Sequence, residues 1–306
     1  MLDWLGSSTE LGRSTHRGYR FDRYAGWKAS GRKLKGLLSR KKGASGRQLC
    51  RIGATDYNES IASILYPGNT LSQYALKDAV EKLEAVLNLT PQQRASVCLR
   101  LDAGFGTDEN LDWSLRKGYQ LVAKSNSGRR AGAWGERIQD WLVIEENRRW
   151  VGIPNEQFHY SLPTRTIAVR WLDRKQKMKH ALYVVTDLQH SPIEICQRYD
   201  LRGGAEVEIR TDKQGLLLTH RRKRLWCAQE ILILLNDLAH NFLSMLSRKL
   251  FQGTPLAGFG PYRLIQNVFN IPGEAIIRDG LLYELHLQKT HPYASILVDV
   301  LPKLWQ

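Results

Sequence analysis

The chain has 306 residues, of which 42% are hydrophobic and 25% charged, so it is long enough to bury the core of one large or two modest globular domains. No apolar run reaches the roughly 18 residues that a membrane helix needs, and the N-terminus lacks the apolar stretch of a secretory signal, so we predict a cytoplasmic protein. The four cysteines are far apart in the sequence and have no histidine at ligand spacing, which argues against a zinc site and a disulfide framework.

The net charge of +15 is concentrated near the N-terminus. Residues 13–51 contain thirteen Lys and Arg residues, among them Arg40, Lys41 and Lys42, against a single acid, Asp22. Aromatic residues lie between these charges, which is typical of a nucleic-acid-binding surface; a solvated or disordered basic segment is the alternative. We define residues 1–45 as a degenerate basic N-terminal segment, in which only HRGYRFDRYAG suggests a strand.

Residues 46–125 have the pattern of an α/β layer. Strands are predicted at residues 48–54, 95–104 and 118–125. Residues 69–87 have helical spacing, with Thr70 as the N-cap, and a second helix is predicted to begin at Thr107 or Asp108.

Asp102 lies near the end of one of these predicted strands. Because α/β sheets usually place their chemistry at the carboxyl ends of strands, Asp102 is a candidate catalytic residue. Asp108 and Asp112 lie nearby, but their position at a helix start favours capping over metal binding.

Residues 126–190 consist of alternating apolar and polar segments, and we predict an all-β insertion here. Two of its strands flank a turn at residues 173–176. The insertion contains Trp141, Trp150 and Trp171, whose simplest role is packing inside a small β domain.

Residues 191–306 are predicted to complete the core. Residues 225–250 form a long helix that is apolar over most of its surface, which predicts burial on several sides, and His240 within it is expected to be a core histidine with hydrogen-bond partners. A hairpin turn is predicted at residues 279–280, and a closing helix at residues 294–304.

A helix beginning at Ser191 is predicted to carry four functional groups on one face. Tyr199, Arg202, Glu206 and Lys213 stand at i, i+3, i+7 and i+14, within about 60° of arc on a continuous helix. A carboxylate beside a guanidinium, a phenol and an ammonium is suited to a metal ion next to a phosphate. A solvated helix face is the alternative.

These four residues match the signature Y-x2-R-x3-E-x6-K, and the segment resembles the region around the last catalytic acid in bacterial insertion-sequence DDE transposases. Residues 100–127 are similar to the second-aspartate segment of the same superfamily, particularly transposase DDE domain group 1. The resemblance extends from about residue 42 to the C-terminus.

The resemblance implies a ribonuclease H-like core with an all-β insertion before the last catalytic helix. It implies that Asp102 and Glu206 are the second and third acids and bind two Mg²⁺ ions, with Mn²⁺ as a substitute, and that Tyr199, Arg202 and Lys213 bind phosphates of the transposon end. The implied partner is double-stranded DNA, at transposon ends and target, bound by a homodimer. In related transposases a tryptophan stacks on an extruded base, which is the alternative role for one tryptophan of the insertion.

The first acid of such a fold lies on its central strand. We assign it to Asp3, on a strand made from MLDWL, so the chain is N-terminally truncated or degenerate relative to the family and is predicted not to cleave DNA. Two functions remain: a transposase that cuts and transfers strands at the element ends, and a catalytically inactive remnant that only binds DNA. A general nuclease is disfavoured, because Lys213 and the insertion suit recognition of a defined DNA end.

Overall fold

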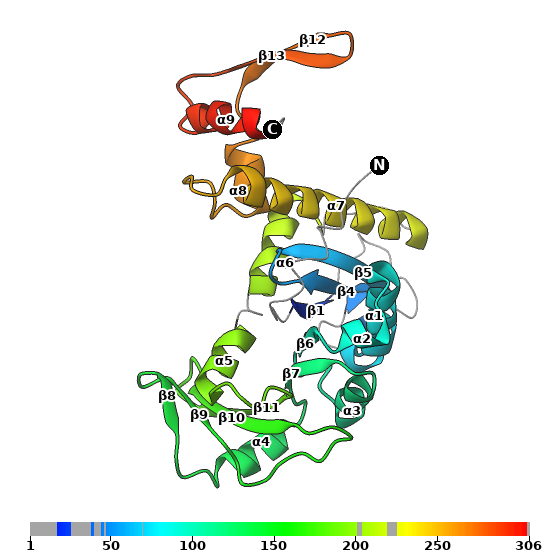
Figure 1. Cartoon of the computed structure of the whole chain (residues 1–306), viewed down its shortest axis with the longest axis vertical. Helices are drawn as coiled ribbons and strands as arrows, with labels where there is room; N and C mark the ends of the chain where they lie inside the picture. The colour runs from blue at the N-terminus through cyan, green and yellow to red at the C-terminus, as the bar shows by residue number, and fades with distance from the viewer. Residues whose placement is uncertain are drawn as a thin grey trace.

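The computed structural model describes the backbone of residues 17–25, 38–39, 44–45, 47–68, 70–200, 204–218 and 225–304, and the side chains of residues 47–68, 70–200, 209–218 and 225–303. A large sheet with its covering helices forms most of the molecule, and a helical unit with a projecting hairpin lies at one end (Figure 1). Among the residues described, none of the helices is long and apolar enough to span a membrane.

A nine-stranded mixed sheet has the strand order β5-β4-β1-β6-β7-β11-β10-β9-β8. Its strands are β1 (Arg17–Ala25), β4 (Arg47–Ala54), β5 (Glu59–Pro67), β6 (Val97–Leu101), β7 (Gln120–Lys124), β8 (Leu142–Glu145), β9 (Arg149–Gly152), β10 (Arg165–Leu172) and β11 (Met178–Val185). β4 is antiparallel to β1 and β5, whereas β6 is parallel to β1 and β7. Three antiparallel strands followed by two parallel ones beside the first is the order of a ribonuclease H-like fold, so the predicted α/β class is confirmed.

The central strand is β1, and the prediction that residues 1–5 supply it is wrong. β1 pairs with β4 through residues 19–25 on one side and with β6 through residues 17–21 on the other. Its sequence, RGYRFDRYA, has few aliphatic residues, which is why hydrophobic periodicity gave only a weak signal. Two short strands, β2 (Leu38–Ser39) and β3 (Ala44–Ser45), form a separate pair.

The insertion is not all-β, and its strands are not a separate sheet. Helix α4 (Gly128–Gly135) lies within it, capped by the Ser127 side chain, and packs on β10 and β11. β11 pairs with β7, so β8 to β11 continue the main sheet beyond its ribonuclease H-like part. The turn between β10 and β11 is confirmed by the hydrogen bond from Gln176 N to Asp173 O, 2.9 Å.

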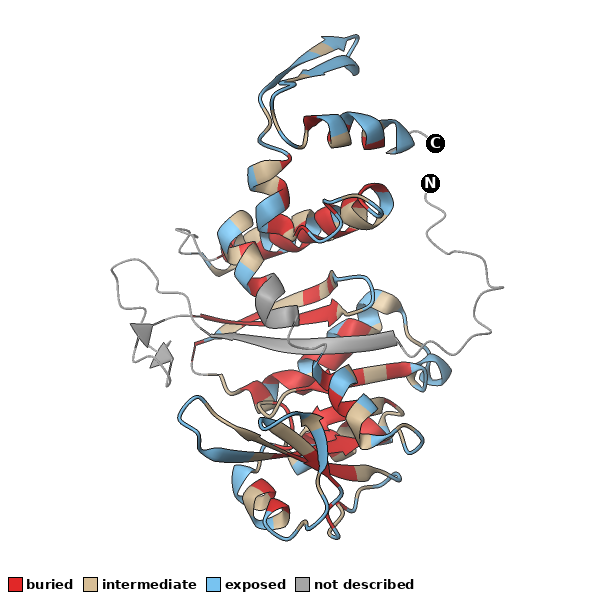
Figure 2. Ribbon diagram, turned by 90° about the vertical axis from the view of Figure 1, so that its left-hand side faces the viewer, coloured by how far each residue is buried: buried red, intermediate tan, exposed pale blue. Residues whose placement is uncertain are grey.

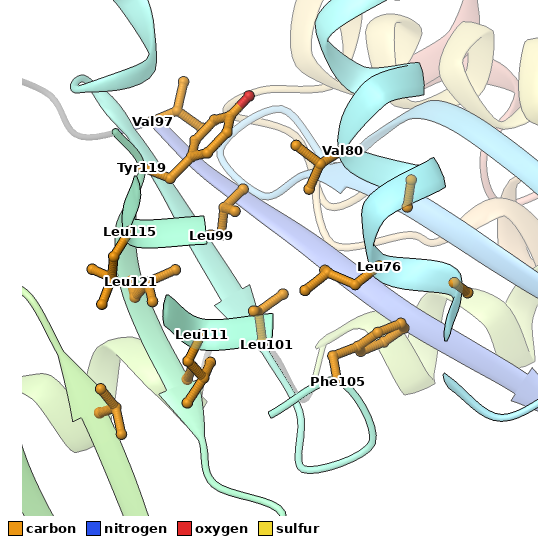
Figure 3. Packing of buried hydrophobic residues seen from close by; sticks show 14 of the residues in the cluster. Leu76, Val80, Val97, Leu99, Leu101, Phe105, Leu111, Leu115, Tyr119 and Leu121 are labelled. Carbon is orange, nitrogen blue, oxygen red and sulfur yellow. The ribbon is translucent and has the colours of Figure 1, made fainter. Parts of the chain in front are cut away.

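Helices cover both faces of the sheet. On one face, α1 (Ser72–Leu87), α3 (Asp108–Arg116) and α4 enclose the largest hydrophobic core, and α2 (Pro91–Arg94) links α1 to β6. Figure 3 shows Leu76 and Val80 of α1 directed toward Leu99 and Leu101 of β6, all four fully buried. On the other face, α5 (Pro192–Asp200) packs through Ile195, Cys196 and Tyr199.

The C-terminal elements form a unit with its own core. They are α7 (Trp226–Leu250), α8 (Pro261–Asn267), β12 (Gly273–Arg278), β13 (Leu281–Leu287), α9 (Ala294–Val300) and a 3₁₀ turn (Leu301–Leu304). The hairpin turn has Asp279 and Gly280 at positive φ, as predicted. The hairpin projects from the body and is almost entirely exposed (Figure 2).

Local capping was predicted with mixed success. Ser191 and Glu194 form a reciprocal capping box at the start of α5, and the Thr107 side chain caps α3 by accepting from Asn110 N. The predicted N-cap Thr70 is wrong, because α1 begins after Leu71 with no side-chain cap.

Leu99 provides a test of the core packing. Replacing this fully buried residue of β6 by alanine is expected to lower the free energy of unfolding by about 2–5 kcal/mol, because it removes apolar contacts and leaves a cavity. Urea unfolding monitored by circular dichroism measures the change. Leu188→Ala, at a leucine that is 54% exposed, is the matched control and should change stability by less than about 0.5 kcal/mol.

Candidate active site

Asp102 is held at the carboxyl end of β6 by a tight turn. Its Oδ1 accepts a hydrogen bond from Gly104 N at 2.7 Å, and no described residue donates to Oδ2. A Cβ at Gly104 would lie 2.9 Å from Ser72 Oγ and 3.0 Å from Asp102 Oδ1, so the turn has no room for a side chain. The loop is fixed further on by Gly106, whose carbonyl accepts from Asn126 N at 2.9 Å and whose Cβ would lie 1.9 Å from the Lys124 carbonyl. Among the described residues, Asp102 therefore has one carboxylate oxygen without a donor, on a support fixed by the turn.

Asp22 lies beside Asp102 in the sheet, and the sequence analysis missed it. In the parallel pairing of β1 with β6, Phe21 is opposite Leu101, and this is the last pair. Asp22 and Asp102 each follow it by one residue. The available signal was that Asp22 is the single acid among residues 13–51 and lies in the one stretch that suggested a strand. Asp3 is outside the described residues, and β1 occupies the central position that had been assigned to its strand.

Glu206 lies in the first turn of α6 (Gly204–Gly215). α5 ends beside β6, where Arg100 donates to the Arg198 carbonyl at 3.1 Å, and α6 starts four residues after α5 and contacts β1. The predicted single helix is thus two helices, so the shared face holds only within α6, where Glu206 and Lys213 are seven residues apart. Arg202 is outside the described residues.

A buried ionic network fixes the other end of α6. Asp212, fully buried, accepts from Arg51 of β4 at 2.5 Å and pairs with His240 Nδ1 of α7 at 2.9 Å. Arg51 also contacts Asp237 of α7 at 2.7 Å, and His240 Nε2 lies 2.9 Å from the Asn58 carbonyl. Both ring nitrogens of His240 thus have hydrogen-bond partners, and the predicted core histidine is confirmed.

This network shifts the pKa of Asp212. Burial opposes the charge of Asp212, but the hydrogen bonds and charges of His240 and Arg51 outweigh it and lower the pKa of Asp212 below its ordinary value. Burial likewise opposes the charge of Arg51, but Asp237 and Asp212 raise its pKa. The Asp212 carboxylate and the Arg51 guanidinium therefore remain charged at neutral pH.

Tyr199 supports the site instead of binding phosphate. Its ring is buried, 4.3 Å from the ring centroid of Tyr183, and its hydroxyl donates to the Leu101 carbonyl at 3.4 Å. A residue enclosed in this way has no surface for a DNA phosphate, so the phosphate role is wrong. Because Leu101 immediately precedes Asp102, this hydrogen bond links α5 to the end of β6.

Two tryptophans of the insertion enclose an arginine. The Arg170 guanidinium lies 4.3 Å from the ring centroid of Trp141 and 5.1 Å from that of Trp150, and burial lowers its pKa. Trp141 also donates its Nε1–H to the Ile138 carbonyl at 2.9 Å. Trp171 is covered in part by Lys124, whose Nζ lies 5.1 Å from the ring. All three rings are half-buried, as packing residues are.

The acids that follow the Asp102 loop are occupied by neighbouring groups. Asp108 pairs with Arg130 at 2.9 Å and accepts from the Tyr160 hydroxyl at 3.1 Å. Asp112 accepts from Ser161 N at 2.7 Å. They border a groove of about 490 Å³, and neither is the cap of α3. Within the described part of the chain, no three His, Cys, Asp or Glu residues are grouped as a metal site; the side chains of Asp22 and Glu206 are not in that part.

Arg40, Lys41 and Lys42 also lie outside the described residues. Lys213, on α6, is half-buried. The arrangement that the structure does describe is therefore one aspartate on a rigid turn, beside the strand that carries a second aspartate.

Comparisons with known proteins agree with the fold. The family model described as transposase DDE domain group 1 matches residues 55–306. No curated protein matches the chain. Among solved structures, a cryo-EM structure of a piggyBac transposase synaptic complex with hairpin DNA is similar, with a TM-score of 0.50 and 14% identity over 83% of this chain and 51% of that chain. At this identity the likeness concerns the fold alone, and the chain spans about half the length of that transposase.

Asp212 tests the ionic network. Asp212→Asn is expected to lower the free energy of unfolding at pH 7 by about 3–5 kcal/mol, because it removes one of the two carboxylates that pair with the buried Arg51 guanidinium. Since the pKa of Asp212 is lowered by folding, this stability is present above the ordinary aspartate pKa and is lost as the pH falls through the lowered value. Urea unfolding of both proteins between pH 7 and pH 3 should show the difference shrinking with acidity. A difference independent of pH would contradict an ionic role.

Proposed function

Because the chain belongs to the transposase DDE domain group 1 family, we propose that it cuts DNA at the ends of a bacterial insertion sequence and joins them to target DNA. The observation that supports this proposal is the pairing of the two strands β1 and β6, which carry or precede two of the aspartates. Asp22 on β1 and Asp102 after β6 are neighbours in register, and the first turn of α6, with Glu206, follows the helix that ends beside β6.

We propose Asp22, Asp102 and Glu206 as the three acids. Asp102 supports the assignment best, since Gly104 holds one of its oxygens and no described residue binds the other. Carboxylate oxygens are the ligands that Mg²⁺ prefers, and Mn²⁺ is expected to substitute. When bound, a pair of such ions activates the attacking hydroxyl and stabilises the leaving oxygen of an in-line phosphoryl displacement.

The protein's own groups position the DNA and the acids. Arg202 and Lys213 are proposed to bind phosphates of the element end, and Arg40, Lys41 and Lys42 to contact the DNA backbone independently of sequence. Of the tryptophans, Trp171 is proposed for base stacking in preference to Trp141 and Trp150, whose rings share Arg170.

Double-stranded DNA is the proposed partner, and two copies of the chain are proposed to act on it together. The piggyBac structure is described as a synaptic complex with hairpin DNA, which supports a nucleic-acid partner for this chain. The second candidate, a DNA-binding remnant without cleavage, depended on the absence of a central strand. β1 removes that reason, so cleavage is the function we favour.

Three substitutions test the acids. Asp22→Asn, Asp102→Asn and Glu206→Gln are each expected to reduce Mg²⁺-dependent nicking of supercoiled DNA carrying the element end by more than about 100-fold, since each removes a charge proposed to hold the metal. DNA binding measured in EDTA should remain within a few-fold of the unmodified chain.

Two controls accompany this test. Asp3→Ala and Asp140→Asn, the latter at an exposed aspartate of the insertion, should leave nicking unchanged. Nicking that survives Asp22→Asn and is lost in Asp3→Ala would restore the earlier assignment. Binding without any nicking by the unmodified chain would favour the remnant.

The basic segment makes a separate prediction for binding. Log K for duplex DNA should fall linearly with log salt, and replacing Arg40, Lys41 and Lys42 by glutamine should reduce the slope by up to about 2.7 for any DNA sequence, because each neutralised phosphate contributes about 0.9. Fluorescence anisotropy of labelled duplex DNA across a salt series measures this slope. Replacing the exposed Arg174, Lys175 and Lys177 instead removes equal charge from the β10–β11 turn and should change the slope less. An equal change for both triples would mean that the basic segment has no special contact.

A further inference from the structure

Helix α7 buries its polar side. The side that faces β5 and α6 carries Gln229, Asn236, Asp237, His240 and Ser244, all buried. These residues are bonded to the body of the protein: Ser244 donates to the Asn58 carbonyl at 2.8 Å, and Asn236 donates to the Leu216 carbonyl at 3.0 Å. Together with the Asp237 and His240 pairs, they fix which side of α7 faces inward.

The outward side of the same helix is apolar. Large apolar side chains that are 53–66% exposed recur at helical spacing along it: Ile231, Leu234, Leu235, Leu238 and Phe242. We call these five residues the α7 stripe. The expectation that this helix is buried on several sides is therefore wrong for the stripe, although the helix itself is confirmed.

The α7 stripe cannot be buried by rotating the helix within one chain. Such a rotation would turn the polar side of α7 away from the body and break the buried hydrogen bonds of Asp237, His240 and Ser244. Each buried hydrogen bond that is lost costs about 1–3 kcal/mol. Contiguous exposed apolar surface of this kind marks an interaction site. The C-terminal half of α7 packs instead through Leu243, Leu246 and Leu250 into the core of the C-terminal unit, which leaves the stripe open.

We propose that the α7 stripe binds the same stripe of a second copy of the chain, as an antiparallel helix pair about a two-fold axis between Leu235 and Leu238. In this arrangement Ile231 of one copy lies opposite Phe242 of the other, so every residue of the stripe meets an apolar neighbour. A self-complementary patch of this kind gives a closed dimer. The centre of this interface would be apolar, as it is in typical homodimer interfaces.

The charges around the stripe favour this partner and this orientation. Between residues 231 and 242 the sequence has no Lys or Arg, and its one acid, Asp237, is buried, so the stripe is not a surface for DNA phosphates. Exposed Glu230 precedes the stripe and exposed Lys249 follows it, whereas Arg248 is paired with Glu59 of the same chain. Antiparallel packing brings the acidic end of one helix toward the basic end of the other and opposes the helix dipoles favourably, whereas parallel packing would bring like charges together.

The first experiment measures mass in solution. Analytical ultracentrifugation of the full chain without DNA or metal, across a concentration series, should give a dimer. Leu238→Asp, at an exposed position, should weaken dimerisation by at least about 100-fold, since the symmetry buries the new charge twice, and should leave the circular dichroism spectrum unchanged. Leu188→Asp, at a comparably exposed leucine outside the stripe, should remain dimeric. A monomeric unmodified chain, or a Leu238→Asp variant that dimerises as before, would overturn the proposal.

The second experiment tests the orientation. In the antiparallel pair, Leu238→Cys in a Cys227→Ser background lies near the two-fold axis and should form an intermolecular disulfide under mild oxidation. The native, exposed Cys227 should not, because it would be about 28 Å along the helix axis from its symmetry mate. Crosslinking through Cys227 and not through position 238 would contradict the antiparallel arrangement. Because neither experiment uses DNA or metal, the dimer proposal can fail while the proposed cleavage stands, and the reverse.

Discussion

The buried guanidinium of Arg51 is the contact on which both the active site and the outer surface of this protein depend. It lies on β4, beside the central strand, and bridges Asp212 of α6 and Asp237 of α7. Burying an arginine requires matched carboxylates and satisfied hydrogen bonds, so this one residue dictates how two helices approach the sheet. The position of α6 then determines where Glu206 lies, and the polar contacts of α7 determine which of its sides faces solvent.

Local patterns predicted most of the regular elements, because their signals are contained within each segment. Strands β4, β6 and β7, the turn at Asp173 and the hairpin turn at Asp279 all follow from alternation and turn residues. β1 gave only a weak signal, in HRGYRFDRYAG, because four of its nine residues are charged, and it is held in the sheet by pairing with β4 and β6. Such pairing between distant segments is not visible in a window of sequence.

The same limit explains the errors at the site. A four-letter signature specified Tyr199 as well as Glu206, but spacing does not say whether a tyrosine faces a ligand or the interior, and here its hydroxyl contacts the Leu101 carbonyl. The prediction that Tyr199, Glu206 and Lys213 share one face assumed a single helix, whereas this segment is divided between α5 and α6. For α7, apolar periodicity located the helix correctly, but the buried side was decided by Arg51, Asn58 and Leu216 far along the chain.

Gly106 has a consequence for how this protein tolerates mutation. Even a methyl group there would overlap the Lys124 carbonyl, and because the obstacle is backbone, no rotamer change of a neighbour relieves it. An alanine at this position would displace the Asp102 loop from the end of β7, although every acidic residue of the chain would still be present. In a library of random variants, inactive clones should therefore accumulate at a residue without a functional group, and a survey restricted to chemically reactive side chains would overlook it.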